Sequence, residues 1–410
     1  MLLNFVLLQP SKQPMKNAAL LFVLLWPICA HAQISKTMRR LPDTGQTQSF
    51  TNTPGEDADF NINPPFFIKN GDGTATDTVT GLMWQQTDGG EMTFEAAQTY
   101  AANLVLGGHS DWRLPTAQEA FSMLNHGQQN PPLDPAVFPN SGAEYWWTGE
   151  TQVGAATRVW VTNAGGGIGN HPKAETISAG GTKKFHVRVV RDVAPPARVA
   201  AQFSTTTNTA FDSLTGLEWQ RFVVPTIQDS MTWEAALVFA ENFVLAGKSD
   251  WRLPNIKELE SINDETRSQP SVYTAVFPGL GSKKFWASTS LPNQSTQAWF
   301  MDTRFGVVSH ELKTLKNSVL LVRGGGGGIV SAAQASLETT GWSVYPNPFS
   351  DHIFLKNAPP DAVVELTNAV GRVFFFGKNV EQEDFSKLPA GMYFLKISEQ
   401  NTAALRLIKK

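Results

Sequence analysis

The clearest candidate metal ligands in this sequence stand in the stretch NGDGTATD, residues 70–77. Asp72 and Asp77 offer carboxylate oxygens, which calcium prefers, and two neighbouring glycines permit a tight loop. The full EF-hand spacing and its terminal Glu are missing, and a β-hairpin turn accounts for the same residues. We therefore expect no cofactor, and keep calcium bound by Asp72 and Asp77 as the alternative.

Other residue types that could do chemistry are scattered along the chain. Apart from His31, the six histidines show no paired i, i+4 spacing of the kind that binds zinc on a helix. The sequence has one cysteine, Cys29, and no G-x-S-x-G nucleophile motif. Carboxylate pairs for glycoside hydrolysis cannot be recognised from spacing alone. We therefore expect a protein that is not an enzyme.

The motif SDWRLP occurs twice, at residues 110–115 and 249–254. TGLMW in the first half matches TGLEW in the second, and MTFEAA matches MTWEAA. Trp147 and Trp286 lie at the same offset as the two motifs, since 286 − 147 = 139. A constant offset across separate motifs indicates a tandem duplication, which predicts two separately folded copies.

Each copy predicts a strand, a helix, the SDWRLP loop, a second helix and then further strands. The second helix begins with a capping box, formed by Thr116 and Glu119 in copy one and by Asn255 and Glu258 in copy two. We expect the Trp of SDWRLP to be buried and its Arg to bind loop carbonyls or a carboxylate. Direct contact of these two residues with a ligand is the alternative.

The two copies differ most in their later loops, where binding residues commonly lie on a rigid scaffold. Residues 163–184 form a Gly-rich excursion in copy one, whereas copy two has a shorter hairpin. Solvated loops are the alternative interpretation. The candidate ligand-binding residues are Trp146, His171, Lys173, Lys183, Asp302, Arg304 and His310.

The first 32 residues have the features of a secretory signal peptide. Lys16 precedes an apolar run over residues 18–28, which is too short to span a bilayer. The small residues of AHAQ predict cleavage between Ala32 and Gln33, and Met15 is the better start codon. Cleavage would remove the only cysteine, so we expect an exported chain without disulfides.

Five glycines at residues 324–328 begin a linker, and short β-type runs follow it. The predicted parts are a signal peptide (1–32), a linker (33–62), copy one (63–193), copy two (200–325), a flexible linker (326–340) and a C-terminal domain (341–410).

The repeated unit resembles the Lcl C-terminal domain family, on NGDGTATDTVTGLMWQQ, SDWRLPTAQE, VFP, YWWT and VRVVRD. The resemblance covers both copies, although copy two lacks the GDG turn. It implies a C-type-lectin-like fold and binding of glycans or surface proteins. The expected fold class is α+β, with two tandem C-type-lectin-like domains and a small C-terminal all-β Ig-like sandwich.

The C-terminal part resembles a type IX secretion system sorting domain, on VYPNPF, VELTNAVGRV and LPAGMYFLKI. That resemblance implies export through the periplasm, with the type IX secretion machinery as a partner. It also implies removal of this domain and attachment of the remainder to surface lipopolysaccharide. The expected location is outside the cell or on the outer-membrane surface.

These features favour an exported, non-catalytic adhesin or carbohydrate-binding protein. A surface enzyme acting on glycans and a purely structural surface protein are the alternatives. The net charge of −3 argues against nucleic acid as a partner, because nucleic-acid binding requires a basic surface. The expected ligand is a glycan or a surface protein.

Overall fold

The computed structural model describes residue 38 and residues 40–175, 184–193, 202–222, 230–324 and, with short gaps, 343–409. Within these ranges, no helix combines the length and the hydrophobicity that crossing a membrane requires. The predicted cleavage site between Ala32 and Gln33 and the predicted linker over residues 326–340 lie outside them.

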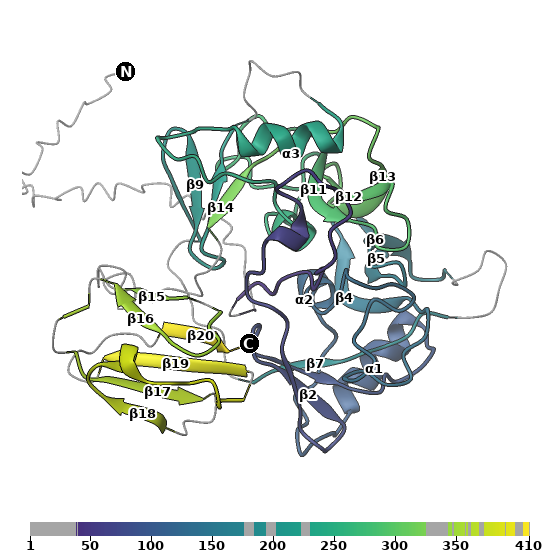
Figure 1. Cartoon of the computed structure of the whole chain (residues 1–410). Helices are drawn as coiled ribbons and strands as arrows, with labels where there is room; N and C mark the ends of the chain where they lie inside the picture. Colours follow the sequence, from purple (N-terminus) through teal and green to yellow (C-terminus); the bar gives the residue numbers. More distant parts are fainter. Residues whose placement is uncertain are drawn as a thin grey trace, which may run out of the picture. The chain divides into compact units, whose positions relative to one another are not determined.

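Copy one contains a four-stranded antiparallel sheet, two helices and three further antiparallel strands (Figure 1). Its first sheet has the order β1-β2-β3-β7, so the last strand of the copy pairs with the third. The two helices flank the SDWRLP loop, as predicted. The elements are β1 (Phe67–Lys69), β2 (Thr74–Asp77), β3 (Leu82–Gln85), α1 (Phe94–Asn103), α2 (Ala117–Ser122), β4 (Trp146–Gln152), β5 (Ala155–Thr162), β6 (Ile168–Pro172) and β7 (Val190–Asp192).

Copy two repeats this order of elements, and its first sheet has the matching order β14-β10-β9-β8. The elements are β8 (Phe203–Thr205), β9 (Thr209–Asp212), β10 (Leu217–Gln220), α3 (Trp233–Glu241), α4 (Ile256–Glu260), β11 (Lys284–Ser290), β12 (Gln297–Asp302), β13 (Val307–Leu312) and β14 (Val322–Gly324).

The two copies share one six-stranded sheet, with the order β11-β12-β13-β6-β5-β4 (Figure 1). β13 and β6 are antiparallel and join through Val308 and Ile168. These two positions are equivalent in the two copies. Trp299 pairs with His310 in copy two as Trp160 pairs with Asn170 in copy one, and the offset between the copies is the same at both positions (310 − 170 = 308 − 168 = 140). Equivalent strands therefore meet as in a twofold-symmetric dimer, and the prediction of two separately folded copies is wrong.

The hydrophobic core follows the same plan. Each copy has a core of its own beneath its first helix, centred on Trp112 and Trp147 in copy one and on Trp251 and Trp286 in copy two. A third core is common to both copies and lies around the second helices, α2 and α4. Burial of this common core makes each copy depend on the other for its stability.

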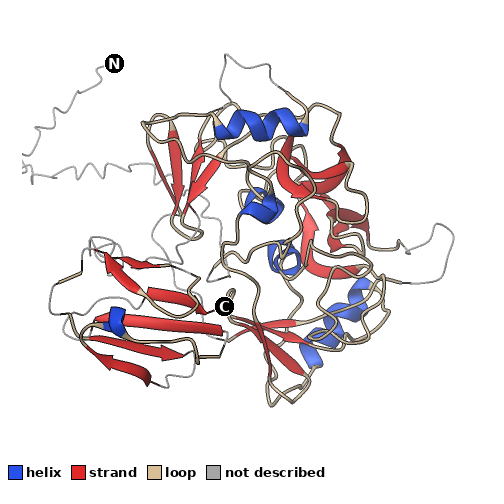
Figure 2. Cartoon of the chain, viewed as in Figure 1, coloured by secondary structure: helices blue, strands red, loops and turns tan. Residues whose placement is uncertain are grey.

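The predicted fold class is wrong. The chain is mostly β, in a propeller-like arrangement of separate antiparallel sheets, and neither copy has a C-type-lectin-like α+β fold. Figure 2 shows how short the helices are, and the longest described α-helix, α1, has 10 residues. The helices lie where the sequence predicted them, but the strands β4–β6 do not extend the first sheet of copy one. The edge of β6 that is left free by its own copy pairs instead with copy two.

The C-terminal domain is also not the Ig-like sandwich that was expected. Its described strands form a four-stranded antiparallel sheet of order β18-β17-β19-β20 and a separate two-stranded pair, β15-β16. Phe349, Tyr393 and Leu395 belong to its core. The strands are β15 (Ser343–Tyr345), β16 (Phe354–Lys356), β17 (Val364–Asn368), β18 (Val373–Gly377), β19 (Gly391–Ile397) and β20 (Leu405–Lys409).

The SDWRLP motif has a structural role in both copies. The Trp is buried in each case, as predicted. Arg113 binds both carboxylate oxygens of Glu119 at 2.7 and 2.8 Å, and Arg252 binds Glu258 in the same way at 2.6 Å. Each Glu also completes the predicted capping box of its helix. One ion pair therefore fixes the loop to the start of the second helix.

Residues 41–63, which we call the strap, precede copy one in the chain and pack against both copies. Lys257 donates to the carbonyl oxygens of Asp43, in the strap, and Ser122, in copy one, at 2.8 Å each. Its ammonium group therefore ties three parts of the chain together. Burial lowers the pKa of Lys257 to about 8, although nearby Asp side chains oppose this shift.

The strap supplies a carboxylate near the start of α4 in copy two, whereas copy one has a carboxylate of its own near the start of α2. In copy one, Glu150 accepts the helix N–H of Ala117 directly at 2.7 Å. The equivalent residue of copy two is Thr289 (289 − 150 = 139), which accepts the N–H of Ile256 and donates to Asp57 of the strap. A stretch predicted as a linker is thus part of the packed structure.

We expect the two equivalent arginines to differ in their contribution to stability. The Arg252 side chain is 6% exposed and that of Arg113 is 34% exposed. Arg252→Ala should lower the free energy of unfolding by about 3–5 kcal/mol, because it leaves Glu258 buried without its partner. Arg113→Ala should cost about 1–3 kcal/mol, because the space that Arg113 vacates is open to water, which can then solvate Glu119, a carboxylate that is itself 0% exposed in the native structure. Urea unfolding followed by Trp fluorescence measures both, and equal losses would contradict this account.

His126 should make the protein sensitive to acid. It lies in the common core against Phe121 and Trp299, and burial lowers its pKa to about 3. The unfolded chain takes up a proton near pH 6.5, so stability should fall below that pH at up to about 1.4 kcal/mol per pH unit. His126→Leu should flatten the fall between pH 6.5 and 3 in urea titrations. An unchanged slope for His126→Leu would refute the assignment.

Candidate functional site

The two predicted calcium ligands both stabilise turns. Asp72 accepts hydrogen bonds from the backbone N–H and hydroxyl of Thr74, at 3.0 and 2.6 Å. Asp77 accepts from the backbone N–H groups of Val79 and Thr80. The two carboxylates lie at opposite ends of β2, so they do not face one common site. Within the described ranges, no three His, Cys, Asp or Glu side chains are grouped as metal ligands.

His171 lies in an aromatic group on copy one. Its ring centroid is 5.5 Å from that of Tyr145 and 5.6 Å from that of Phe185, and its Nδ1 lies 3.0 Å from Glu175. Copy two has polar residues at the equivalent places. There Lys284 lies 2.6 Å from Glu311, which also accepts a hydrogen bond from Asn317.

Lys173 makes a cation–π contact that copy two repeats with a lysine of its own. Its Nζ lies 4.9 Å from the ring centroid of Phe94, at the start of α1. Lys313 of copy two occupies the equivalent place, 3.7 Å from the ring centroid of Trp233. The loop residue singled out in copy one therefore has a counterpart, which the sequence comparison missed because the loop lengths differ.

The candidate residues of copy two stabilise its hairpin. Asp302 accepts the backbone N–H of Arg304 at 2.9 Å. His310 lies 2.7 Å from the side chain of Gln297 on the neighbouring strand, and burial lowers its pKa. Among the described residues, no hydrogen bond, ion pair or ring contact joins Asp302 or His310 to His171 or Lys173. Lys183 lies outside the described residues.

Trp146 leads to a polar group that the sequence did not reveal. Its Nε1 donates to Asp88 at 3.1 Å, and the Nδ1 of His186 lies 3.1 Å from the same carboxylate oxygen. On its other side, His186 lies 3.5 Å from Glu144, while Arg188 lies 3.8 Å from Asp88. We call Asp88, Glu144, Trp146, His186 and Arg188 the Asp88 cluster.

The charges in this cluster are set by its surroundings. Burial alone would raise the pKa of Asp88, but the hydrogen bond from His186 and the charge of Arg188 lower it below its ordinary value. Burial lowers the pKa of Arg188 to about 10, with the Asp88 charge opposing the shift. At neutral pH the cluster therefore holds an ionised carboxylate in front of a charged guanidinium group.

The residue that could have indicated the cluster is Arg188, which stands where copy two has Leu320. Its side chain is 1% exposed, and it donates to the carbonyl of Gln85 and the hydroxyl of Ser141. Burying an arginine without partners costs free energy of folding, so partners are expected, but the sequence alone does not say where they lie. Asp88 and Glu144 come from two separate loops, which only the fold brings together.

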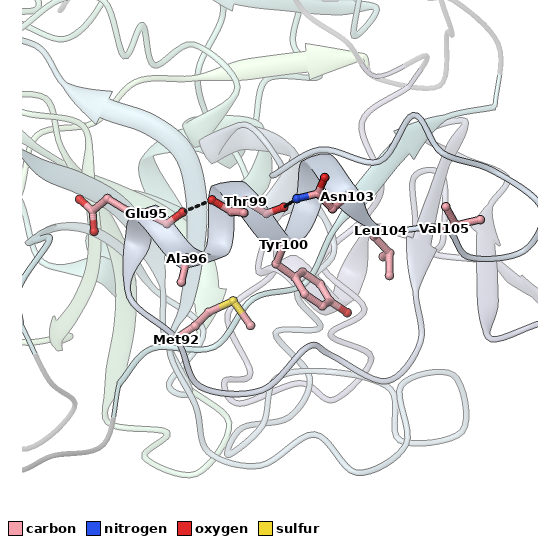
Figure 3. A pocket seen from close by; sticks show the side chains of 8 residues that line it. All are labelled: Met92, Glu95, Ala96, Thr99, Tyr100, Asn103, Leu104 and Val105. Carbon is pink, nitrogen blue, oxygen red and sulfur yellow. Dashed lines mark hydrogen bonds between the residues drawn. The ribbon is translucent and has the colours of Figure 1, made fainter.

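A groove of about 700 Å³ runs beside α1 (Figure 3). Figure 3 shows Met92 and Tyr100 pointing to the same side of the helix, with Leu104 and Val105 at its end. The Tyr100 ring is held in place, because its hydroxyl accepts a hydrogen bond from Gln85. The remaining lining residues are Glu95, Ala96, Thr99 and Asn103.

Copy two carries two phenylalanines at the equivalent positions. Phe239 and Phe243 stand in place of Tyr100 and Leu104 (239 − 100 = 243 − 104 = 139), and their ring centroids are 5.2 Å apart. The Tyr hydroxyl of copy one is thus absent there. The two helix faces present different chemistry on one backbone plan.

Comparison with known proteins identifies three segments. The family described as Lcl C-terminal domain matches residues 73–191 and 208–323, which together exceed half of the chain. The secretion system C-terminal sorting domain matches residues 343–410. No curated protein matches the chain.

If Lys173 and Lys313 are structural, they should behave alike. Lys173→Gln and Lys313→Gln should each lower the free energy of unfolding by about 0.5–1 kcal/mol, because each removes a cation–π contact. Urea titration gives both values. A ligand-binding role for Lys173 alone would instead appear as lost binding with stability unchanged.

Proposed function

Because this chain belongs to the Lcl C-terminal domain family, we propose that it is a non-catalytic binding protein that recognises a glycan at the cell surface. The groove beside α1 carries the proposal. Its volume of about 700 Å³ lies in the range of small-molecule sites, roughly 300–1,000 Å³. The Tyr100 ring and its apolar neighbours suit the apolar face of a sugar ring, and Glu95 offers a carboxylate to its hydroxyl groups.

The location agrees with such a role. The C-terminal sorting domain makes this an exported protein, found on the cell surface or released from the cell. Its partner during export is the type IX secretion machinery. Surface lipopolysaccharide as the anchor after export remains part of the proposal, because it rests on the resemblance of the tail alone.

The test is a glycan array probed with the purified chain, once with calcium and once with chelator. Specific binding in both arms supports the proposal. Binding that chelator abolishes also supports it, and shows that calcium takes part in binding. A blank array in both arms would overturn glycan binding and favour a surface protein as the ligand.

A larger side chain in the groove should weaken glycan binding. Leu104→Phe introduces the residue that copy two has at Phe243, and we expect it to weaken glycan binding about tenfold or more. The reciprocal change Phe243→Leu is the matched control and should leave the Kd unchanged. Calorimetric titration with an array hit gives both values. An unaltered Kd for Leu104→Phe would show that the groove is not the site.

A further inference from the structure

The groove beside α1 contains a hydroxyl group that is held in a fixed position. The oxygen of Tyr100 accepts a hydrogen bond from Gln85 at 2.7 Å. The ring lies close to Gly89, where an added Cβ would come within 2.6 Å of the ring carbon Cζ. A tyrosine hydroxyl both accepts and donates, and no described residue accepts the proton of Tyr100. The groove therefore presents one oriented O–H donor that an acceptor on a ligand can use.

The groove also contains an acceptor, and copy two shows what this helix position can bind. Glu234 is equivalent to Glu95 (234 − 95 = 139) and accepts the hydroxyl of Thr51, in the strap, at 3.1 Å. In copy one, no described residue donates to the Glu95 carboxylate. The same position of the first helix thus binds a donor in copy two, and in copy one it is open to a donor on a ligand.

The fold does not need the Tyr100 hydroxyl. Copy two has Phe239 at this position, and its first helix packs on the same plan. Gln220, which is equivalent to Gln85 in the matching strand, donates instead to the backbone carbonyl of Phe222 at 2.5 Å. The hydroxyl is therefore a chemical difference between the copies that the architecture they share does not require.

An acetamido group matches the donor, the acceptor and the apolar lining of this groove. Its carbonyl accepts a hydrogen bond, its N–H donates one, and its methyl group gains free energy on leaving water for apolar side chains such as Met92 and Leu104. A free amino group would pair with Glu95 alone, and that side chain is exposed, where an ion pair contributes little. A plain hydroxyl group has no methyl group to place against the apolar lining.

We infer that the groove beside α1 selects glycans that carry an acetamido group, with Tyr100 donating to its carbonyl oxygen and Glu95 accepting its N–H. Met92 and Leu104 then contact the methyl group. The inference rests on the proposed glycan binding and narrows it to N-acetylated sugars. It makes Tyr100 and Glu95 the residues that determine specificity.

The experiment measures the Kd of the full chain for matched oligosaccharides of the gluco and galacto series. Each oligosaccharide is used with an acetamido, a free amino or a hydroxyl group at carbon 2. We expect the acetamido form to bind about tenfold or more tightly than the other two. Tyr100→Phe and Glu95→Ala should each lower this preference about threefold or more, because each removes one of the two hydrogen bonds.

The matched controls are the equivalent positions of copy two. Phe239→Tyr and Glu234→Ala should leave the preference for the acetamido form unchanged. Thermal unfolding of each variant shows whether it is folded. Tyr100→Phe introduces the copy-two residue, and Glu95 is exposed, so we expect both variants to fold.

The outcomes separate this inference from the proposed function. Binding without preference for the acetamido form would overturn the inference and leave the function standing. A preference that either folded variant retains in full would do the same, because the selective contact would then lie elsewhere. Array hits that lack acetamido groups, with no binding in the matched series, would also overturn the inference alone. No binding of any glycan by the full chain would overturn both.

Discussion

The ion pair within W-R-L-P-x-x-x-E is the interaction on which both copies depend. Its Arg is held by the backbone too, since Arg113 pairs with Val190 and Arg252 with Val322. The Glu receives the guanidinium group and caps the second helix at the same time. The loop, the second helix and the closing strand of each copy are therefore fixed relative to one another through one side-chain pair. A buried pair of this kind gives little net stability, but losing one partner leaves a costly charge, so both residues are needed together.

In each copy, one strand (β6 or β13) has an edge that no strand of its own copy pairs with. β6 and β13 pair with each other along these edges, and the pairing of Ile168 with Val308 lies at the centre of the resulting symmetry. The strap breaks that symmetry, because it binds copy two through Asp57 where copy one uses its own Glu150. Two copies of one plan have thus become dependent on each other and on a segment outside both.

Sequence reasoning succeeded where the cause is local. The capping boxes at Thr116 and Asn255 and the buried Trp of each SDWRLP motif depend on a few neighbouring residues, and they were predicted correctly. It failed where the cause is a contact between distant segments. The shared sheet depends on an edge pairing that no periodicity reveals, and the Asp88 cluster joins residues up to 100 positions apart, since 188 − 88 = 100. The lectin-like fold came from a family resemblance, not from these residues, and it was wrong.

The divergence of the copies bears on how such a protein would bind. Two equal sites on one chain would raise avidity, because the second contact would form at a high effective concentration. Every candidate binding group considered above differs between the copies in its residues or its contacts, except the Lys contact at the first helix, which is kept in both. Copy two instead uses the equivalent positions for its own packing and for the strap. If copy one binds a glycan as proposed, copy two contributes indirectly: it completes the shared sheet and the common core on which the stability of copy one depends. Under that proposal the duplication provides a scaffold for one binding copy, and avidity would have to come from many chains on one surface.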